Sequence, residues 1–546
     1  MKRSVTANNP LFHFKGVAWE AIPDRWREYA AISVDAAHAD MNERLERLYA
    51  AGAPVILQTE FYNSFMRGPV VTPERLDELL NRYNNILGVS MVELSCSNLT
   101  DIQRARLMDT LRVCVRHDVY FIWEDMGFPD RRHVFAKAGE DEELFGLIKE
   151  CSDHFIFIAK INGWGEFFLT QSLAMGSWTT GLCAAWGVNC EDFWWFENNL
   201  TRHFKPVLEK RFYNMLLKDC GPGPANNLLT AQEFACPEAL IGQMMLTAAM
   251  GGACIYSFEN PDRVSYYKGK WSPLFERVIS PLFDIILGEG ILPDLPAVVS
   301  RVRAAYHADD WDAPALCGTG EALFRGLYGC NEQSDEFILE HMCTTRVIPS
   351  SGRYYYIPVT PTLAEEESER VYGKRLYNSK TLPADKRAAF DAICSPVSAG
   401  DACVMNIGDV WLVMNWRETE DTRQDFDFKA GEYRLKGALP ANGYILARLC
   451  KGELRLHVNN MRLDDAAAIW ENASFTRASF MDEYIKSDCP WFDELYLTEL
   501  HISADRGELK VNIDMPEAFA YERIEEKGSV ALALRHNGSV DITVEA

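Results

Sequence analysis

Acidic residues recur at the ends of short apolar runs in this chain, and paired carboxylates are what hydrolysis of a glycosidic bond requires. One carboxylic acid protonates the leaving oxygen, while a carboxylate activates water or attacks the carbon. Glu93, in NNILGVSMVELSC, is the strongest candidate for the acid, because burial at the end of an apolar run would favour its protonated form. The alternative is a structural carboxylate that bonds only to a neighbouring strand.

The segment 175–199 is the densest aromatic stretch of the chain. Indole rings stack on sugar faces while carboxylates bind hydroxyl groups or water, so this segment is a candidate sugar site. Rings that only pack helices together are the alternative. The candidate substrate-binding residues of this segment are Trp178, Trp186, Glu191, Trp194 and Trp195, with Asp192 as a candidate catalytic carboxylate.

Three further positions complete the candidate site. Glu259, followed by Asn260 and Pro261, could share the role of base or hold the attacking water, unless it only forms an ion pair. Glu60, at the end of an earlier apolar run, and Asn63, just after that run, are candidate substrate contacts.

The sequence lacks the motifs of several other kinds of catalysis. The sequence has no HExxH, no CxxC pair and no clustered His for a catalytic metal, and no GxGxxG, GxxxxGK[ST] or GxSxG. We therefore expect neither a metal nor a cofactor. A lyase or isomerase on a barrel would normally use a lysine, for which Lys160 is the obvious candidate.

The first 260 residues alternate short apolar runs with longer amphipathic stretches, a pattern typical of repeated β-α units. Eight such runs predict a closed (β/α)8 barrel of the TIM type, whose active site lies at the carboxyl ends of the strands. Thr72 is the expected cap, and Pro73 the first residue, of one helix between them. The candidate strands are 14–20, 54–61, 86–94, 119–125, 155–161, 180–188, 228–234 and 253–259. The acids at or near their ends are Glu20, Glu60, Glu93, Asp125, Glu233 and Glu259.

Beyond about residue 300 the apolar pattern changes to a period of two, with turn residues between short runs. This alternation predicts an antiparallel β-sandwich that follows the barrel. We expect a catalytic barrel in residues 1–300, a connecting segment with the GRYYYIP motif in 301–400, and a β-sandwich in 401–546.

Charge and composition exclude several partners. The net charge of −24 disfavours both nucleic acid and an anionic membrane surface, and no stretch approaches the length of a membrane span. We therefore expect an oligosaccharide or polysaccharide as the partner, while the oligomeric state is not indicated. The 15 scattered Cys and the lack of an apolar leader favour a cytoplasmic protein, or a secreted one whose leader has been removed.

Several stretches resemble glycoside hydrolase family 98. LGVSMVELSC is similar to the strand that carries the general acid of the family, and residues 176–194 are similar to the segment with a base carboxylate. GGACIYSFENP resembles the last barrel strand, and VIPSSGRYYYIPVTP the segment that joins the barrel to the β domain. GDACVMNIGDVWLVMNW resembles the start of the C-terminal domain, so the resemblance spans both expected domains.

The resemblance implies an inverting, endo-acting enzyme in which Glu93 is the general acid. Asp192 and Glu259 resemble the pair that orients and deprotonates water, although the adjacent Glu191 could take the place of Asp192. The family releases blood-group oligosaccharides by cleaving a β-1,4-galactosyl bond, and some members act on xylan. A non-catalytic glycan-binding protein on the same scaffold is the alternative from another class.

Overall fold

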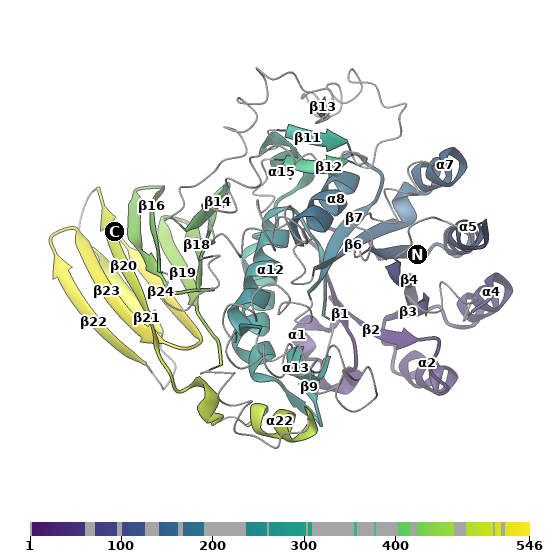
Figure 1. Cartoon of the computed structure of the whole chain (residues 1–546), viewed down its shortest axis with the longest axis horizontal. Helices are drawn as coiled ribbons and strands as arrows, with labels where there is room; N and C mark the ends of the chain where they lie inside the picture. The colour runs from purple at the N-terminus through teal and green to yellow at the C-terminus, as the bar shows by residue number, and fades with distance from the viewer. Residues whose placement is uncertain are drawn as a thin grey trace, which may run out of the picture.

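The computed structural model describes residues 3–60, 71–94, 101–125, 141–161, 167–190, 236–258, 261–301, 304–307, 354–357, 376–377, 402–415, 423–463, 477–486, 488–505, 508–514 and 519–546. Its first part is a closed barrel of eight parallel strands, each paired with its neighbour in chain order (Figure 1). This confirms the predicted fold. The barrel strands are β1 (Leu11–Phe14), β2 (Ala30–Asp35), β3 (Val55–Glu60), β4 (Ile86–Leu94), β5 (Tyr120–Asp125), β6 (Phe155–Ile161), β7 (Ala185–Cys190) and β8 (Ile255–Phe258).

One predicted strand was wrong in position, and one barrel strand was not predicted. The predicted strand 14–20 overlaps β1 only at Phe14, because Gly16 adopts a φ of +67° that turns the chain into the 3-10 helix Trp19–Ala21. The second strand is AAISVD, which the sequence pattern did not predict. Its alanines have low strand propensity, and a strand buried on both faces shows no alternation. The predicted strand 228–234 lies outside the described residues.

Helices cover the outside of the barrel (Figure 1). Thr72 caps one of them as predicted, since its Oγ1 accepts a hydrogen bond from the Arg75 amide at 3.2 Å and Pro73 is the first helical residue. None of the described helices is long and apolar enough to cross a membrane. The described α-helices up to β8 are α1 (Asp24–Arg27), α2 (Met41–Ala50), α4 (Pro73–Arg82), α5 (Asp101–Arg116), α7 (Glu142–Glu150), α8 (Phe167–Thr179) and α12 (Glu238–Met250).

Shorter elements follow β8 and extend the barrel part. They are α13 (Pro261–Val264), β9 (Tyr266–Tyr267), β10 (Lys270–Trp271), the π-helical stretch η3 (Phe275–Ile279), α14 (Ser280–Glu289) and α15 (Leu295–Arg301). A small parallel sheet then joins β11 (Ala304–His307) to β12 (Tyr354–Ile357) and β13 (Leu376–Tyr377). The strand β12 is the YYYI portion of the GRYYYIP motif, and it packs on α8.

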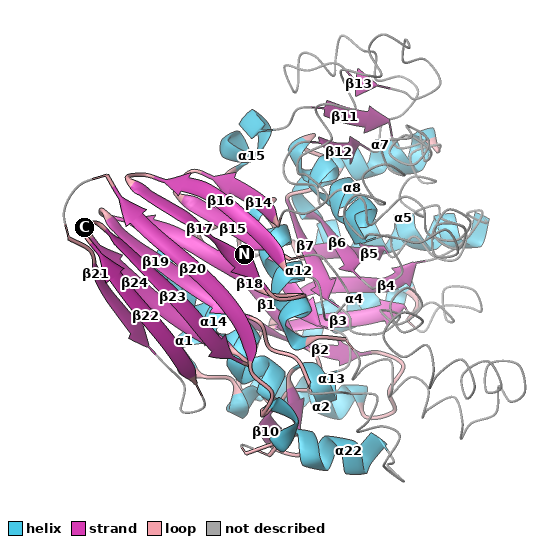
Figure 2. Ribbon diagram, turned by 60° about the vertical axis from the view of Figure 1, so that its left-hand side comes forward, coloured by secondary structure: helices cyan, strands magenta, loops and turns pink. Residues whose placement is uncertain are grey.

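The last part of the chain is two antiparallel sheets that share one apolar core, as the period-two pattern predicts (Figure 2). The six-stranded sheet has the order β14-β15-β18-β19-β24-β21 and the five-stranded sheet the order β16-β17-β20-β23-β22. Their strands are β14 (Cys403–Ile407), β15 (Val410–Met414), β16 (Gln424–Ala430), β17 (Tyr433–Leu439), β18 (Tyr444–Cys450), β19 (Glu453–Asn459), β20 (Tyr496–Ala504), β21 (Lys510–Asp514), β22 (Ala520–Glu526), β23 (Ser529–His536) and β24 (Ser539–Glu545). The helix α22 (Arg477–Tyr484) lies between β19 and β20 in the sequence.

Helix α12 lies between the barrel and these sheets (Figure 1), and every one of its residues is buried. Gln243 of this helix donates from Nε2 to the carbonyl oxygens of Asn415, Asn442 and Gly443, at 3.3, 2.8 and 3.2 Å. A Cβ atom at Gly242 would lie 2.6 Å from the Tyr444 hydroxyl, so only glycine permits this close approach of α12 to β18. The two parts of the chain therefore share a packed interface.

A buried ion pair ties three segments together at this interface. Arg263 of α13 donates to the Oε1 atom of Glu238 at 2.8 Å, and the Tyr484 hydroxyl donates to the same oxygen at 3.0 Å. Both charged side chains are 0% exposed. Burial raises the pKa of the Glu238 carboxyl above its ordinary value, and the neighbouring guanidinium opposes that shift.

Several cysteines of the barrel part are buried, reduced thiols, among them Cys114, Cys183, Cys190 and Cys254. Burial raises the pKa of each thiol, that of Cys254 to about 12. These side chains therefore behave as apolar packing groups.

We expect Arg263→Met to lower the free energy of unfolding by about 3–5 kcal/mol, because it leaves the Glu238 carboxylate buried without its counter-charge. Denaturant titration of the full chain measures the loss. The double variant Glu238→Leu/Arg263→Met removes both charges, so it should recover a large part of the stability. A single variant as stable as the native protein would contradict the structural role of the pair.

Candidate active site

Three of the predicted acids lie at the carboxyl ends of adjacent barrel strands. Glu60 is the last residue of β3, Glu93 the next-to-last residue of β4, and Asp125 the last residue of β5. Because the strands are parallel and neighbouring, one arc of the barrel rim carries all three positions. Glu20 lies instead in the 3-10 helix Trp19–Ala21, so its prediction as a strand-end acid was wrong.

The regular pairing of strands is interrupted where Glu93 lies. The register between β4 and β5 shifts between Met91 and Leu94, and the register between β3 and β4 shifts between Gln58 and Glu60. Such irregularities re-aim side chains and are frequent next to active sites. Glu93 therefore occupies the part of β4 that departs from simple alternation.

The remaining candidates follow the ends of β7 and β8 in the sequence but lie outside the described residues. Glu191 comes directly after Cys190, the last residue of β7, and Glu259 directly after Phe258, the last residue of β8. The candidates outside the described residues are Asn63, Glu191, Asp192, Trp194, Trp195, Glu233 and Glu259.

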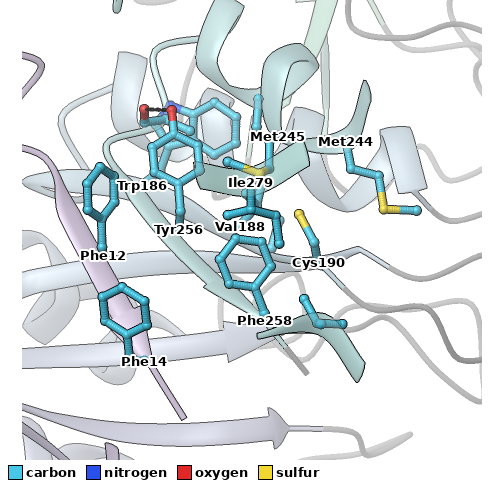
Figure 3. Packing of buried hydrophobic residues seen from close by; sticks show 14 of the residues in the cluster. Phe12, Phe14, Trp186, Val188, Cys190, Met244, Met245, Tyr256, Phe258 and Ile279 are labelled. Atoms are coloured by element: carbon cyan, nitrogen blue, oxygen red, sulfur yellow. Dashed lines mark hydrogen bonds between the residues drawn. The ribbon is translucent and has the colours of Figure 1, made fainter. Parts of the chain in front are cut away.

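Trp186 does not line a sugar site, contrary to the sequence-based assignment. It is 0% exposed and packs with Val188 and Cys190 in the core between the barrel wall and the helices (Figure 3). Its Nε1 donates to the carbonyl oxygen of Gly251 at 3.2 Å. Because Trp186 is the second residue of β7, it lies near the amino end of the barrel, opposite the mouth.

Trp178, like Trp186, packs at the amino end of the barrel. It lies in the last turn of α8 and packs so closely on Gly252 that a Cβ atom there would be 2.5 Å from its ring. Since Gly252 precedes β8, this contact is also at the amino end of the barrel. For these two tryptophans the helix-packing alternative is correct, and the substrate-binding assignment was wrong.

The interior of the barrel has an apolar floor. Alternate residues of all eight strands form one buried cluster, which also includes Val5 of the segment before β1. The Val5 amide donates to the Tyr120 hydroxyl at 3.3 Å, so this segment closes the amino end of the barrel. The strand residues of the cluster are Leu11, Ala31, Ile56, Leu87, Tyr120, Ile122, Ile156, Ile158, Ala185 and Ile255.

Polar side chains replace apolar ones toward the mouth of the barrel. Further along the interior face of each strand lies a polar residue, and we call this set the polar tier. This residue comes two positions after the last cluster residue in six strands, three positions after it in β4 and four positions after it in β7. The tier consists of His13, Ser33, Gln58, Ser90, Glu124, Lys160, Asn189 and Ser257. All but Gln58 are less than 9% exposed, so the tier is a buried polar layer beneath the strand-end acids.

Glu124 is the acidic member of the tier, and the sequence did not single it out as a candidate. Its Oε1 accepts a hydrogen bond from the Asn189 Nδ2 at 2.6 Å, and it is 1% exposed. The signal was present in YFIWED, where Tyr120, Ile122 and Glu124 alternate on one face while the neighbouring Asp125 ends the run. On the other side of the barrel, the Ser257 Oγ and the His13 Nδ1 lie 3.2 Å apart.

This arrangement suits acid-base chemistry on a polar, uncharged ligand. Acidic residues end three adjacent strands of the rim, and buried hydrogen-bonding groups form the layer below. Among the described side chains, no group of three His, Cys, Asp or Glu residues is placed to hold a metal ion. A closed parallel barrel with acids at the carboxyl ends of its strands has the architecture of barrel enzymes.

Comparison with known protein families shows which family of proteins this chain belongs to. The model of glycosyl hydrolase family 98 matches residues 14–293, and the model of its C-terminal domain matches residues 296–546. The chain therefore belongs to glycosyl hydrolase family 98, which confirms the resemblance noted in its motifs.

Individual relatives agree with this assignment. A blood-group-substance endo-1,4-beta-galactosidase of Clostridium perfringens is 21% identical over 510 residues, which are 87% of this chain and 58% of that relative. The chain thus matches only part of the length of that protein. The catalytic module of a family 98 glycoside hydrolase from Streptococcus pneumoniae TIGR4 has the same fold, with a TM-score of 0.76, 18% identity and full coverage of both chains. That module has been solved with the H-disaccharide blood group antigen and with the LewisY pentasaccharide blood group antigen.

We expect Trp186→Phe to lower the free energy of unfolding by about 1–3 kcal/mol, through lost packing and the unpaired Gly251 carbonyl group. Glycan affinity, measured by calorimetry, should stay unchanged because the ring is remote from the mouth. Weaker glycan binding at unchanged stability would contradict this placement.

Proposed function

We propose that this protein is an endo-acting, inverting glycoside hydrolase that cleaves internal β-1,4-galactosyl bonds in blood-group-type glycans. The observation that carries the proposal is the match of the two family 98 models to both parts of the chain. The glycans named for the similar structures and for the Clostridium perfringens relative support the choice of substrate.

In this mechanism Glu93 donates a proton to the leaving glycosidic oxygen. Its place near the end of β4, at the break in strand register, supports this role. Asp192 and Glu259 orient a water molecule and remove its proton, and they follow the ends of β7 and β8 in the sequence. Attack of this water on the opposite face of the sugar inverts the anomeric centre in one step.

Substrate contacts complete the proposed site. Glu60 ends the strand next to that of Glu93, so it shares the rim with the proposed acid. Trp194 and Trp195 remain the candidates for stacking on a sugar ring, now that Trp178 and Trp186 have packing roles. The net charge of −24 also favours a neutral oligosaccharide over an anionic one.

We expect Glu93→Gln to abolish hydrolysis while the fold and glycan binding persist. The amide keeps the shape of the acid but has no proton to donate, which removes a rate factor of about 10²–10⁴ or more. The assay uses an oligosaccharide with the H or LewisY antigen, with products sized by mass spectrometry.

The native protein and the Glu93→Gln variant together discriminate between the alternatives. A native protein that binds these glycans without cleaving them would be a glycan-binding protein rather than an enzyme. Near-native turnover by Glu93→Gln would refute the assignment of the acid.

The stereochemistry of the product tests the inverting mechanism. An inverting pair leaves room for water, with the carboxyl groups roughly 6.5–9.5 Å apart, whereas a retaining pair lies ~5–5.5 Å apart. Proton NMR of the first product from a β-linked substrate should therefore show the α anomer before mutarotation. A β anomer at first turnover, or a covalent glycosyl-enzyme on Asp192 or Glu259, would overturn the mechanism.

A further inference from the structure

One hydrogen bond crosses the interior of the barrel. The Asn189 Nδ2 on β7 donates to the Glu124 Oε1 on β5 at 2.6 Å. Because β6 separates these two strands in the closed barrel, the bond joins them through the interior rather than along the sheet. Glu124 is 1% exposed and Asn189 is 0% exposed, so this contact is shielded from water.

The bond lies at the mouth end of both strands. Glu124 is the next-to-last residue of β5, and Asn189 is the next-to-last residue of β7. In the sequence Asn189 precedes Glu191 by two residues and Asp192 by three. The hydrogen bond that holds Asn189 therefore also holds the end of β7, which directly precedes the proposed base-side carboxylates in the sequence.

Stability alone does not account for a carboxylate at this position. The interior of such barrels is normally filled by branched apolar side chains, as in the tier directly below. Burial of a carboxylate costs several kcal/mol, and apolar side chains of similar volume often give equal or greater stability. A buried charge beside a proposed site is therefore better explained by function.

Other ionisable groups share the interior with Glu124. Lys160 of β6 is 2% exposed and is the register partner of Asn189, and His13 of β1 is 3% exposed. On the adjacent β4 side the interior residue is Ser90, while Glu60, Glu93 and Asp125 are the acids at the ends of β3, β4 and β5. A change of charge at Glu124 would act on the acids of the mouth across a low-dielectric interior.

We propose that Glu124 is a positioning residue for the hydrolase site. It orients Asn189, which precedes Glu191 by two residues in the sequence, and it keeps a negative charge beneath the mouth. This inference rests on the proposed function, since it assigns Glu124 to the same reaction.

Two substitutions separate the hydrogen bond from the charge. Glu124→Gln keeps an oxygen that can accept from Asn189 but removes the charge. Glu124→Asp keeps the charge but shortens the side chain by one methylene group, which weakens the bond across the barrel. Thr498→Val is the matched control, because Thr498 forms a buried 3.1 Å contact with His536 in the C-terminal sheets, far from the barrel mouth.

The experiment measures kcat, KM and the pH profile of kcat/KM on a glycan with the H antigen, with thermal unfolding of each variant. Loss of a negative charge makes nearby carboxylic acids ionise more readily, so Glu124→Gln should move both limbs of the profile to lower pH. A shift of roughly 0.6–1.2 pH units corresponds to one charge about 10 Å away at an effective dielectric constant of about 20–40. Glu124→Asp should lower kcat about 10- to 100-fold at similar KM, without this shift, because misplaced groups reduce kcat.

The outcomes distinguish this inference from the proposed function. An inactive native protein would refute the proposed function and the inference that rests on it. An active native protein with unchanged kcat and pH profile in both Glu124 variants would refute the positioning role alone, as would an equal shift in Thr498→Val. If Glu124→Gln does not fold, Asn189→Ser removes the donor instead, and an unchanged kcat in that variant would likewise overturn the inference.

Discussion

The structure depends on the burial of helix α12, whose apolar residues face in every direction. A helix of this kind is stable only when it is covered on all sides, and here the barrel covers one side while β14 and β15 contact the other. Its one long amide side chain, that of Gln243, is satisfied by carbonyl groups of the C-terminal sheets. Neither part of the chain alone provides that environment, so the two parts complete a single core.

The same interface holds the chain that follows β8. Arg263 lies four residues after Glu259, one of the two proposed base-side carboxylates, and its buried partner Glu238 begins α12. The chain that follows β8 is therefore anchored at Arg263. The Tyr484 hydroxyl brings the C-terminal part into this anchor. Helix α22 of the C-terminal part is thus joined, through Glu238, to the chain that follows β8.

Sequence patterns predicted the elements whose physical signals are local. The barrel, the antiparallel sheets and the Thr72 cap follow from apolar period and cap chemistry. The second strand was missed because AAISVD has neither alternation nor strong strand formers.

In the candidate site, Glu60 and Glu93 were correctly placed at strand ends, whereas Trp178 and Trp186 were misassigned. Composition alone cannot show which end of the barrel a ring faces. Glu124 was missed because its importance depends on a contact with a residue 65 positions away.

The buried thiols allow local unfolding of this protein to be measured without an added label. A thiol that is buried and held protonated does not react with alkylating reagents, so modification of Cys114, Cys183, Cys190 or Cys254 requires the surrounding helices and strands to separate first. The rate of alkylation at each position therefore measures how often that part of the barrel opens. Because Cys489 lies in the C-terminal part, the same reaction can show whether the two parts of the chain open together or one after the other.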